Sequence, residues 1–504
     1  MVDSEKEAIH DDELKKSSDG MKQIKNSLLY FLPVIVSTVI PIMTLPVFTR
    51  ILSKEDYGLL ALAQIYGTLI NGLANFGMQL AYERNYFEYR DSNKKTAQLL
   101  YSVLLFVTLN FVVLASFTFV FGSIISKMIT GSNEHGVFLF WVTISYFLSG
   151  ISYYYLTYFK NSEEARSFVT YTVAAGLINL VIAVVLVAYY KIGVIGLVYG
   201  QISAGVIIFL ILSCKFVASH PPSLSRSILS DTLKIGYPLT PRTIFGVISK
   251  QSDKYLIGLL GSIGGVGIYS IGQKISLTVF SYMTALENVF SPRVYSKMFD
   301  AKENASDSIG MYLTPFVYIS TSLALLVALL SEEIVSVLTP SSYHGAIDIV
   351  IVLAMFYGVQ FFGKLSGLQL LYARKTHVTS MLTLVTIGFH LAVSIPFILM
   401  WGAIGAAWAM LLGGIGSLVV WFVVGQQYYR INWEYVRVAV VFLVFLLSAI
   451  LMIILRDLMI AYYLRVLVKL SLIVIYLYVG TKIQVVTRNN LLLLRKAVLA
   501  YFPK

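Results

Sequence analysis

Three basic residues and one acidic residue lie in or beside the apolar segment FGVISKQSDKYLIGLLGSIGGVGIY, which covers residues 245–269. On an α-helix, at roughly 100° per residue, all four fall on about one third of the surface. A charge that faces lipid near the centre of a span costs at least ~2.5 kcal/mol, so we expect this arc to face protein or water. The four residues are Arg242, Lys250, Asp253 and Lys254.

This arc has a basic excess that suits an anionic ligand. Asp253 can pair with Lys250 or Lys254, which leaves a surplus of about two positive charges for phosphate or carboxylate groups. The alternative for Lys250 and Lys254 is that their long stems carry the ammonium groups to the membrane boundary. For Lys254, near the end of its predicted span, both interpretations stay open.

Four further residues complete the candidate binding set. Lys274 follows Gly267 and Gly272 in the next apolar segment and extends the same wall. Lys364 lies ten residues before Arg374, about 15 Å along a helix, and either lines the cavity or pairs with Asp348 or a carbonyl group. Gln64 and Gln273 occupy equivalent positions in an internal repeat. His390, also within a span, could titrate, but we interpret it as a packing or hydrogen-bonding residue.

The sequence contains no recognisable catalytic set. It has no HExxH, GxSxG or Walker A motif, and no acidic pair on a sizeable loop. Its one cysteine, Cys214, excludes an internal disulfide and a cysteine-based metal site. We therefore expect neither an enzyme nor a protein with a bound cofactor or metal.

The composition is that of a polytopic helical membrane protein. Of 504 residues, 57% are hydrophobic and 13% are charged, whereas a soluble domain carries roughly 25% charged residues. The formal net charge is +12, but the basic residues are scattered through short loops, so nucleic acid is not an expected partner. The polar residues 1–26 lack the pattern of a signal peptide.

Apolar segments separated by polar breaks predict about fourteen transmembrane helices. The segments 58–82 and 267–291 are the least apolar of the set. The predicted spans are 28–49, 58–82, 97–121, 137–159, 168–190, 193–214, 236–259, 267–291, 311–330, 345–371, 378–400, 403–425, 436–455 and 459–481.

The distribution of basic residues predicts the orientation. If the N-terminus is cytoplasmic, 26 lysines and arginines lie on the inner side and 6 on the outer side, with 6 inside spans. This asymmetry follows the positive-inside rule and places both termini in the cytoplasm. We expect a multi-pass protein of a bacterial or archaeal cell (inner) membrane.

The two halves of the chain resemble each other at an offset of 209 residues. This offset aligns Gln64 with Gln273 and Arg84 with Arg293, and also aligns Gly193 with Gly402. Transporters are often built from such repeats, with the substrate site between them. The predicted organisation is a polar N-terminal segment (1–27), an N-lobe of six helices (28–217), a cytoplasmic linker (218–235), a C-lobe of six helices (236–425), and two further helices with a cytoplasmic tail (426–504).

Two segments resemble the polysaccharide flippases. LPVFTRILSKEDYGLLALAQ (45–64) is similar to the opening hairpin of that family, where an L-S-x-x-x-Y/F-G turn joins the first two helices. Asp253-Lys254-Tyr255-Leu256-Ile257-Gly258, followed by Gly267-Ile268-Tyr269, resembles its D-K/R-x-x-I/L-G…G-x-Y segment. The chain is thereby identified as resembling the Wzx-like branch of the multidrug/oligosaccharidyl-lipid/polysaccharide (MOP) exporter superfamily.

The resemblance implies two six-helix lobes around a central cavity, with helices one, two, seven and eight at its heart. It implies transfer of undecaprenyl-diphosphate-linked oligosaccharide from the inner to the outer leaflet by alternating access. The expected partners are the lipid bilayer, this lipid-linked glycan, a polysaccharide polymerase and other export proteins. Coupling to the membrane potential, or to an H⁺ or Na⁺ gradient through Asp253 or another acidic residue, is also open.

Three alternatives stay open at this stage. One is a lipid II-type flippase, although those proteins bring several arginines into the cavity where this chain has lysines. Another is a multidrug or cation exporter of the same superfamily, which would favour a net acidic cavity. The third is a membrane polysaccharide polymerase or ligase, which would need a larger outer loop than this sequence provides.

Overall fold

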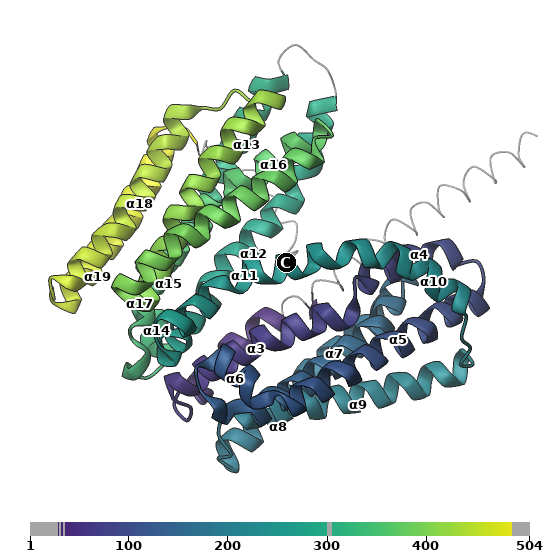
Figure 1. The fold of residues 1–504 in the computed structure, drawn as a ribbon. Helices are drawn as coiled ribbons and strands as arrows, with labels where there is room; N and C mark the ends of the chain where they lie inside the picture. The colour runs from purple at the N-terminus through teal and green to yellow at the C-terminus, as the bar shows by residue number, and fades with distance from the viewer. Residues whose placement is uncertain (1–28, 30–31, 34–35, 300–304, 486–504) are drawn as a thin grey trace, which may run out of the picture. The chain divides into compact units, whose positions relative to one another are not determined.

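The computed structural model describes residues 29, 32–33, 36–299 and 305–485, and in this part of the chain all regular structure is helical (Figure 1). The chain divides into two compact units, residues 1–251 and 252–504. This result confirms the predicted all-helical fold class. The lobe and linker boundaries stay a prediction.

The first unit is built mainly from long helices that pack side by side. Helix α7 contacts α3, α5, α8 and α9, so it lies at the centre of this bundle. The elements are α2 (Leu45–Phe48), α3 (Lys54–Asn75), α4 (Met78–Tyr89), α5 (Asn93–Val120), α6 (Gly122–Thr130), η1 (Asn133–His135), α7 (Gly136–Asn161), α8 (Ala165–Val184), η2 (Val185–Tyr189), α9 (Ile195–Ser219), α10 (Arg226–Gly236), η3 (Tyr237–Leu239) and the first part of α11 (Thr240–Leu260).

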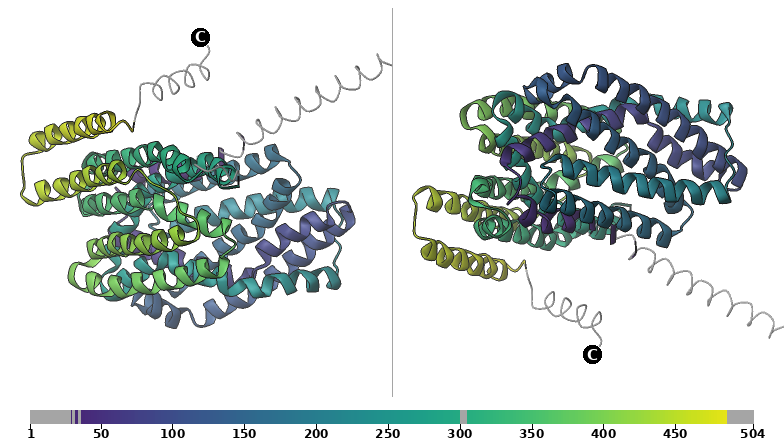
Figure 2. Two further views of the ribbon diagram at one scale, coloured as in Figure 1. Left: turned by 90° about the horizontal axis from the view of Figure 1, so that it is seen from above. Right: turned by 90° about the horizontal axis from the view of Figure 1, so that it is seen from below.

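The second unit has α15 at its centre, in contact with α12, α13, α17 and α18. Helices α18 and α19 run side by side at its edge (Figure 2). The elements after α11 are α12 (Ile263–Phe299), α13 (Ala305–Leu329), α14 (Ser331–Leu338), η4 (Ser341–Tyr343), α15 (Ala346–Val359), α16 (Phe361–Tyr372), α17 (Thr376–Tyr428), α18 (Tyr435–Asp457) and α19 (Tyr462–Lys482).

The offset of 209 residues is confirmed in the boundaries of the helices. Helix α3 begins at Lys54 and α12 at Ile263, whereas α5 ends at Val120 and α13 at Leu329. Helix α9 ends at Ser219 and α17 at Tyr428, again 209 residues apart. The same helical plan therefore occurs twice along the chain, as expected for a repeat transporter.

The repeat also preserves a break in the backbone between two apolar helices. Gly193 and Gly402 both have positive φ angles, 74° and 62°. At Gly402 two helices that would otherwise be continuous, together forming α17, are separated by this non-helical residue. Residues with a Cβ rarely adopt this conformation, which explains glycine at both equivalent positions.

Ten helices in the described part of the chain are long and apolar enough to cross a membrane. One of them covers residues 377–428 and contains the break at Gly402, whereas α11 and α12 are outside this set of ten. Part of the first predicted span falls outside the described residues, and residues 36–48 form a shorter apolar helix. Length and hydropathy thus establish a multi-pass protein, while the number fourteen stays a prediction.

The L-S-x-x-x-Y-G turn has a simple local explanation. The Ser53 hydroxyl accepts a hydrogen bond from the backbone N–H of Asp56, and the Asp56 carboxylate accepts one from the backbone N–H of Ser53. This capping box satisfies free N–H groups at the first turn of α3. The motif therefore fixes the residue at which α3 begins.

Candidate functional site

The predicted acidic residue Asp253 lies at the centre of a buried polar cluster in the second unit. Its side chain comes from α11, and the residue is only 3% exposed. One carboxylate oxygen, Oδ1, lies 2.7 Å from Nε2 of His390 on α17. The other, Oδ2, accepts a hydrogen bond of 3.2 Å from the hydroxyl of Tyr269 on α12. Three helices therefore meet at one carboxylate.

The surrounding groups hold His390 in place. Ser394, one turn further along α17, has its hydroxyl 3.4 Å from Nε2. Gly413 lies beside the ring, because an added Cβ would stand 3.0 Å from Nδ1. The absence of a side chain at Gly413 thus makes room for this imidazole.

The Asp253–His390 pair lies far from both ends of the helical segment that carries the histidine. By helical rise, His390 is about 21 Å from the start of α17 and about 18 Å from the break at Gly402. The segment is long and apolar enough to cross a membrane. Ionisable residues at such depth are costly, and they commonly mark functional sites.

Two of the predicted lysines lie beside this cluster. Lys254 is half-buried on α11, and its charge interacts with those of Lys274 on α12 and of Asp253. Lys274 is also half-buried. Two ammonium groups and one carboxylate that is paired with an imidazole give this part of the unit a basic excess. Such a site attracts phosphate or carboxylate groups.

The remaining members of the predicted set have different surroundings. Gln273 is buried on α12, next to Lys274 in sequence. Gln64 is half-buried on α3, and Lys250 is exposed on α11, and both belong to the first unit. The backbone of Arg242 is helical, but its side chain lies outside what the structure describes.

The structure therefore brings together Asp253, Lys254 and Lys274. A binding role for the whole predicted set stays a prediction.

Lys364 has a partner that the sequence did not indicate. Its Nζ lies 2.7 Å from a carboxylate oxygen of Glu287 and 5.2 Å from the centre of the Phe280 ring. The suggested partner, Asp348, instead pairs with Arg456. Of the alternatives left open for Lys364, the pair with Asp348 is wrong, because helical rise gives the depth of a residue and not the neighbouring helix that it faces.

The sequence did not assign His390 or Tyr269 to the candidate site. His390 was interpreted as a packing or hydrogen-bonding residue, and the second interpretation is confirmed, with Asp253 as the partner. Tyr269 stood in the quoted G-x-Y segment without a role. The signal that links them is that Asp253 and His390 are both ionisable residues within apolar segments, and burial requires such groups to have partners.

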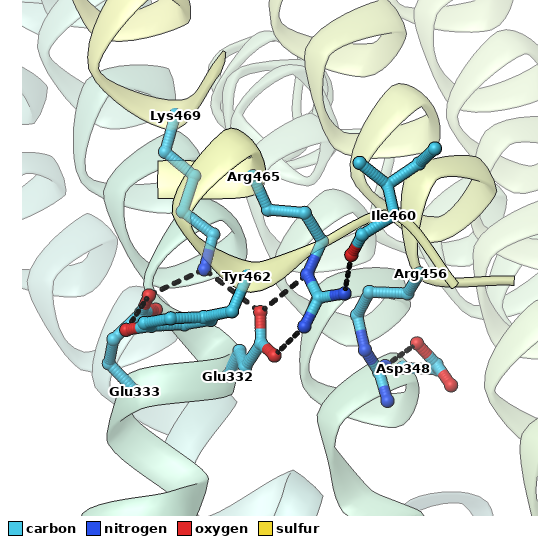
Figure 3. A network of polar contacts seen from close by, with 8 residues as sticks. All are labelled: Glu332, Glu333, Asp348, Arg456, Ile460, Tyr462, Arg465 and Lys469. Carbon is cyan, nitrogen blue, oxygen red and sulfur yellow. Dashed lines mark hydrogen bonds and ion pairs between the residues drawn. The ribbon is translucent and has the colours of Figure 1, made fainter. Parts of the chain in front are cut away.

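A second polar cluster joins α18 and α19 to α14 and α15 (Figure 3). Lys469 donates to Glu333 at 2.6 Å and to Glu332 at 3.1 Å, and Arg465 pairs with Glu332 at 2.5 Å. Near the end of α18, Arg456 pairs with Asp348. Each of the three basic groups thus pairs with a carboxylate of another helix, and we interpret this cluster as structural.

Glu332 of this cluster lies outside the apolar spans. Burial alone would raise the pKa of Glu332, but the hydrogen bonds and charges of Arg465 and Lys469 hold it below its usual value of 4.5. The carboxylate is therefore ionised near neutral pH and keeps both basic partners.

Comparison with known proteins agrees with this architecture. The sequence profile of a family described as polysaccharide biosynthesis protein matches residues 47–348, which is more than half of the chain. No curated protein matches the sequence.

Several solved structures share the fold. The lipid II flippase MurJ, in an inward closed conformation, matches with a TM-score of 0.66 at 16% identity, over 92% of this chain and 100% of that chain. An inward-facing multidrug resistance MATE family transporter of the MOP superfamily matches with a TM-score of 0.62 at 14% identity, over 80% and 97% of the two chains. A Vibrio cholerae MATE transporter reaches 0.55 at 14% identity, over 82% and 98%.

These neighbours are flippases and transporters and not enzymes. Together with the match over residues 47–348, they lead to one conclusion. The chain belongs to the polysaccharide biosynthesis protein family and has the fold of the MOP superfamily.

Proposed function

We propose that this protein is a flippase that moves an undecaprenyl-diphosphate-linked oligosaccharide from the inner to the outer leaflet by alternating access. The observation that supports the proposal is that two half-buried lysines, Lys254 and Lys274, lie near each other, with Lys254 next to Asp253. The chain that carries them belongs to the polysaccharide biosynthesis protein family. Ionisable groups within the apolar helices of a membrane protein commonly mark the path of a polar substrate. A diphosphate is such a substrate.

In this mechanism the lysines attract the diphosphate while the prenyl chain stays in lipid. Lys250 and Arg242, on the same helical arc, extend the basic surface, and Gln273 supplies a hydrogen bond for the sugars. Gln64, the equivalent residue of the first repeat, remains a predicted member of the binding set. Lys364 also belongs to the predicted binding set, but its ammonium group already pairs with Glu287, so we rank it below the other lysines. Rocking of two repeated halves then transfers the headgroup from one side of the membrane to the other.

The distribution of lysines and arginines supports a cell membrane location with both termini in the cytoplasm. In that orientation the membrane potential favours outward movement of an anion, by ~2.3 kcal/mol per charge per 100 mV. A polysaccharide polymerase on the outer side is the natural consumer of the transferred glycan. An H⁺ or Na⁺ gradient is an additional candidate for the energy source.

Structural similarity to MATE transporters makes a multidrug exporter the second candidate. Such a protein would bind organic cations, and the positive charges of Lys254 and Lys274 would oppose that binding. The lipid II flippase MurJ shares the fold over its whole length. Lipid II-type cargo therefore belongs to the same proposal, as one member of the lipid-diphosphate class.

The proposal is tested by glycan export in cells that lack their own copy of the protein. We expect Lys254→Ala and Lys274→Ala to reduce surface glycan while protein abundance in the membrane stays normal. Lys234→Ala is the matched control, because the Lys234 side chain is 74% exposed and pairs with Asp231, three residues away on the same helix. Full export by the double variant Lys254→Ala/Lys274→Ala would refute the role of this site.

A further inference from the structure

The Asp253–His390 pair can hold a proton inside the second unit. Its two nearest atoms, Oδ1 of Asp253 and Nε2 of His390, are 2.7 Å apart, so a proton between them binds to both groups. With one shared proton the pair has no net charge, whichever of the two groups carries it. When that proton leaves, the pair carries one negative charge.

The charged and titratable groups around the pair come from every helix that packs against it. Helix α11 contributes Lys254, α12 contributes Tyr269 and Lys274, and α15 contributes Tyr357. The tyrosine hydroxyls are neutral donors, and the two lysines are positive. Lys254 directly follows Asp253 on α11, and its charge interacts with those of Asp253 and of Lys274, so Lys254 links the pair to the second lysine.

This environment favours a proton over a metal cation. Sodium and other hard cations prefer several oxygen ligands, as calcium and magnesium do. The pair offers one carboxylate that already bonds to an imidazole and a phenol. The two neighbouring lysines also repel any added cation.

We propose that the Asp253–His390 pair is a proton-binding site whose occupancy sets the affinity of Lys254 and Lys274 for an anionic headgroup. This inference rests on the function proposed above. Without the proton, the negative pair competes with the ligand for the two lysines. With the proton bound, the pair is neutral and no longer repels the anion from the two lysines.

Thermodynamic linkage makes the effect reciprocal, so binding of the anion draws a proton into the pair. One unit charge at about 10 Å from the ligand, with an effective dielectric constant near 20, changes affinity by about tenfold. The expected sign is tighter binding at lower pH, because the proton occupies the pair there.

The probe is a short-chain prenyl-diphosphoryl N-acetylglucosamine, because both diester phosphates keep their charge through the range in which histidine titrates. Calorimetry on the purified full-length protein, at about pH 6 and about pH 8 and in buffers of different ionisation enthalpy, gives both affinity and proton uptake. We expect about tenfold tighter binding at the lower pH and net uptake of protons on binding. A prenyl glucoside without phosphate should show neither effect.

Two variants should move the affinity in opposite directions. Asp253→Asn removes the negative charge, so it should bind as the wild type does at low pH, without proton uptake. His390→Gln leaves the Asp253 carboxylate without its imidazole, so it should bind weakly at both pH values. Glu287→Gln, which disrupts the ion pair with Lys364 instead, should keep the wild-type pH response.

The inference is overturned if wild-type affinity changes less than twofold with pH, if the probe does not bind, or if either variant keeps the wild-type proton uptake. Should Asp253→Asn fail to fold, His390→Gln alone still decides the question. Failure of the proposed function is a separate result. A protein that shows the linkage but never transfers a lipid-linked glycan refutes the function alone, whereas transfer without the linkage refutes only the inference.

Discussion

Replacement of Lys469 by methionine tests whether the cluster in Figure 3 holds α19 to the second unit. Lys469 is buried on α19, with a side chain only 3% exposed, and it lies within 3.1 Å of carboxylates from both Glu332 and Glu333. Methionine has a similar volume without the charge. Among residues that the structure describes, Glu333 would keep only its hydrogen bond from Tyr462, while Glu332 would keep Arg465.

Removal of one partner from a buried ion pair costs about 3–5 kcal/mol. The lower end applies here, because the Glu333 side chain is 28% exposed and can recover some hydration. For a unit of roughly 250 residues, a loss of about 3 kcal/mol lowers the melting temperature by roughly 6–12 °C. The assay is the apparent melting temperature of the purified protein, read from its monodisperse fraction after heating.

Two further variants make this result specific. Lys234→Met removes a lysine from an exposed pair with Asp231, so it should cost less than about 1 kcal/mol. In Lys469→Met/Glu333→Gln the unpaired charge is gone, and part of the lost stability should return. If Lys469→Met and Lys234→Met have the same melting temperature, the burial and charge argument is refuted.

Two other predictions concern the backbone and pH. Gly402→Ala should destabilise the protein by about 1–2 kcal/mol, because alanine is strained at the positive φ of this position. The control Gly388→Ala, in helical backbone with open space around it, should be neutral or stabilising. Equal melting temperatures for the two variants would refute the strain at Gly402. Because the pKa of Glu332 lies below its usual 4.5, its ion pairs should contribute fully above pH 4.5 and lose that contribution as the pH falls further. The difference in melting temperature between wild type and Glu332→Gln should shrink on acidification, and a constant difference would contradict this sign.

The helical architecture could be predicted because apolar length and repeat spacing are properties of the local sequence. The offset that aligns Gly193 with Gly402 also aligns the ends of helices in the structure. The helical phase placed Arg242, Lys250, Asp253 and Lys254 on one arc, and a common binding role for this arc stays a prediction. The least apolar predicted spans, 58–82 and 267–291, do not match helix boundaries closely, because α3 and α12 begin a few residues earlier.

Partners between distant helices could not be predicted in the same way. Asp253 and His390 are 137 residues apart, and their contact depends on how α11 packs against α17. Lys364 was linked to Asp348 from depth alone, yet its partner is Glu287. The helical phase and the depth of a residue are properties of its own helix. They do not identify the residue of another helix that it contacts.

The cluster around Lys469 did leave a signal in the sequence. At the offset of 209, the first repeat has Ser123, Ile124 and Leu139 where the second has its three carboxylates. Those carboxylates, Glu332, Glu333 and Asp348, face the helix pair that follows the second repeat. A comparison of the two repeats for unmatched charges would have found them.

Transfer of a lipid-linked oligosaccharide between leaflets tests the central claim most directly. The purified protein is reconstituted into vesicles with fluorescent undecaprenyl-diphosphate oligosaccharide, and the fraction that becomes accessible to an external lectin or quencher is followed over time. We predict transfer by the wild type, faster with an outside-positive membrane potential, and slow transfer by Lys254→Ala/Lys274→Ala. Transfer no faster than in protein-free vesicles, across lipid-linked glycans of different composition, would contradict the proposed function.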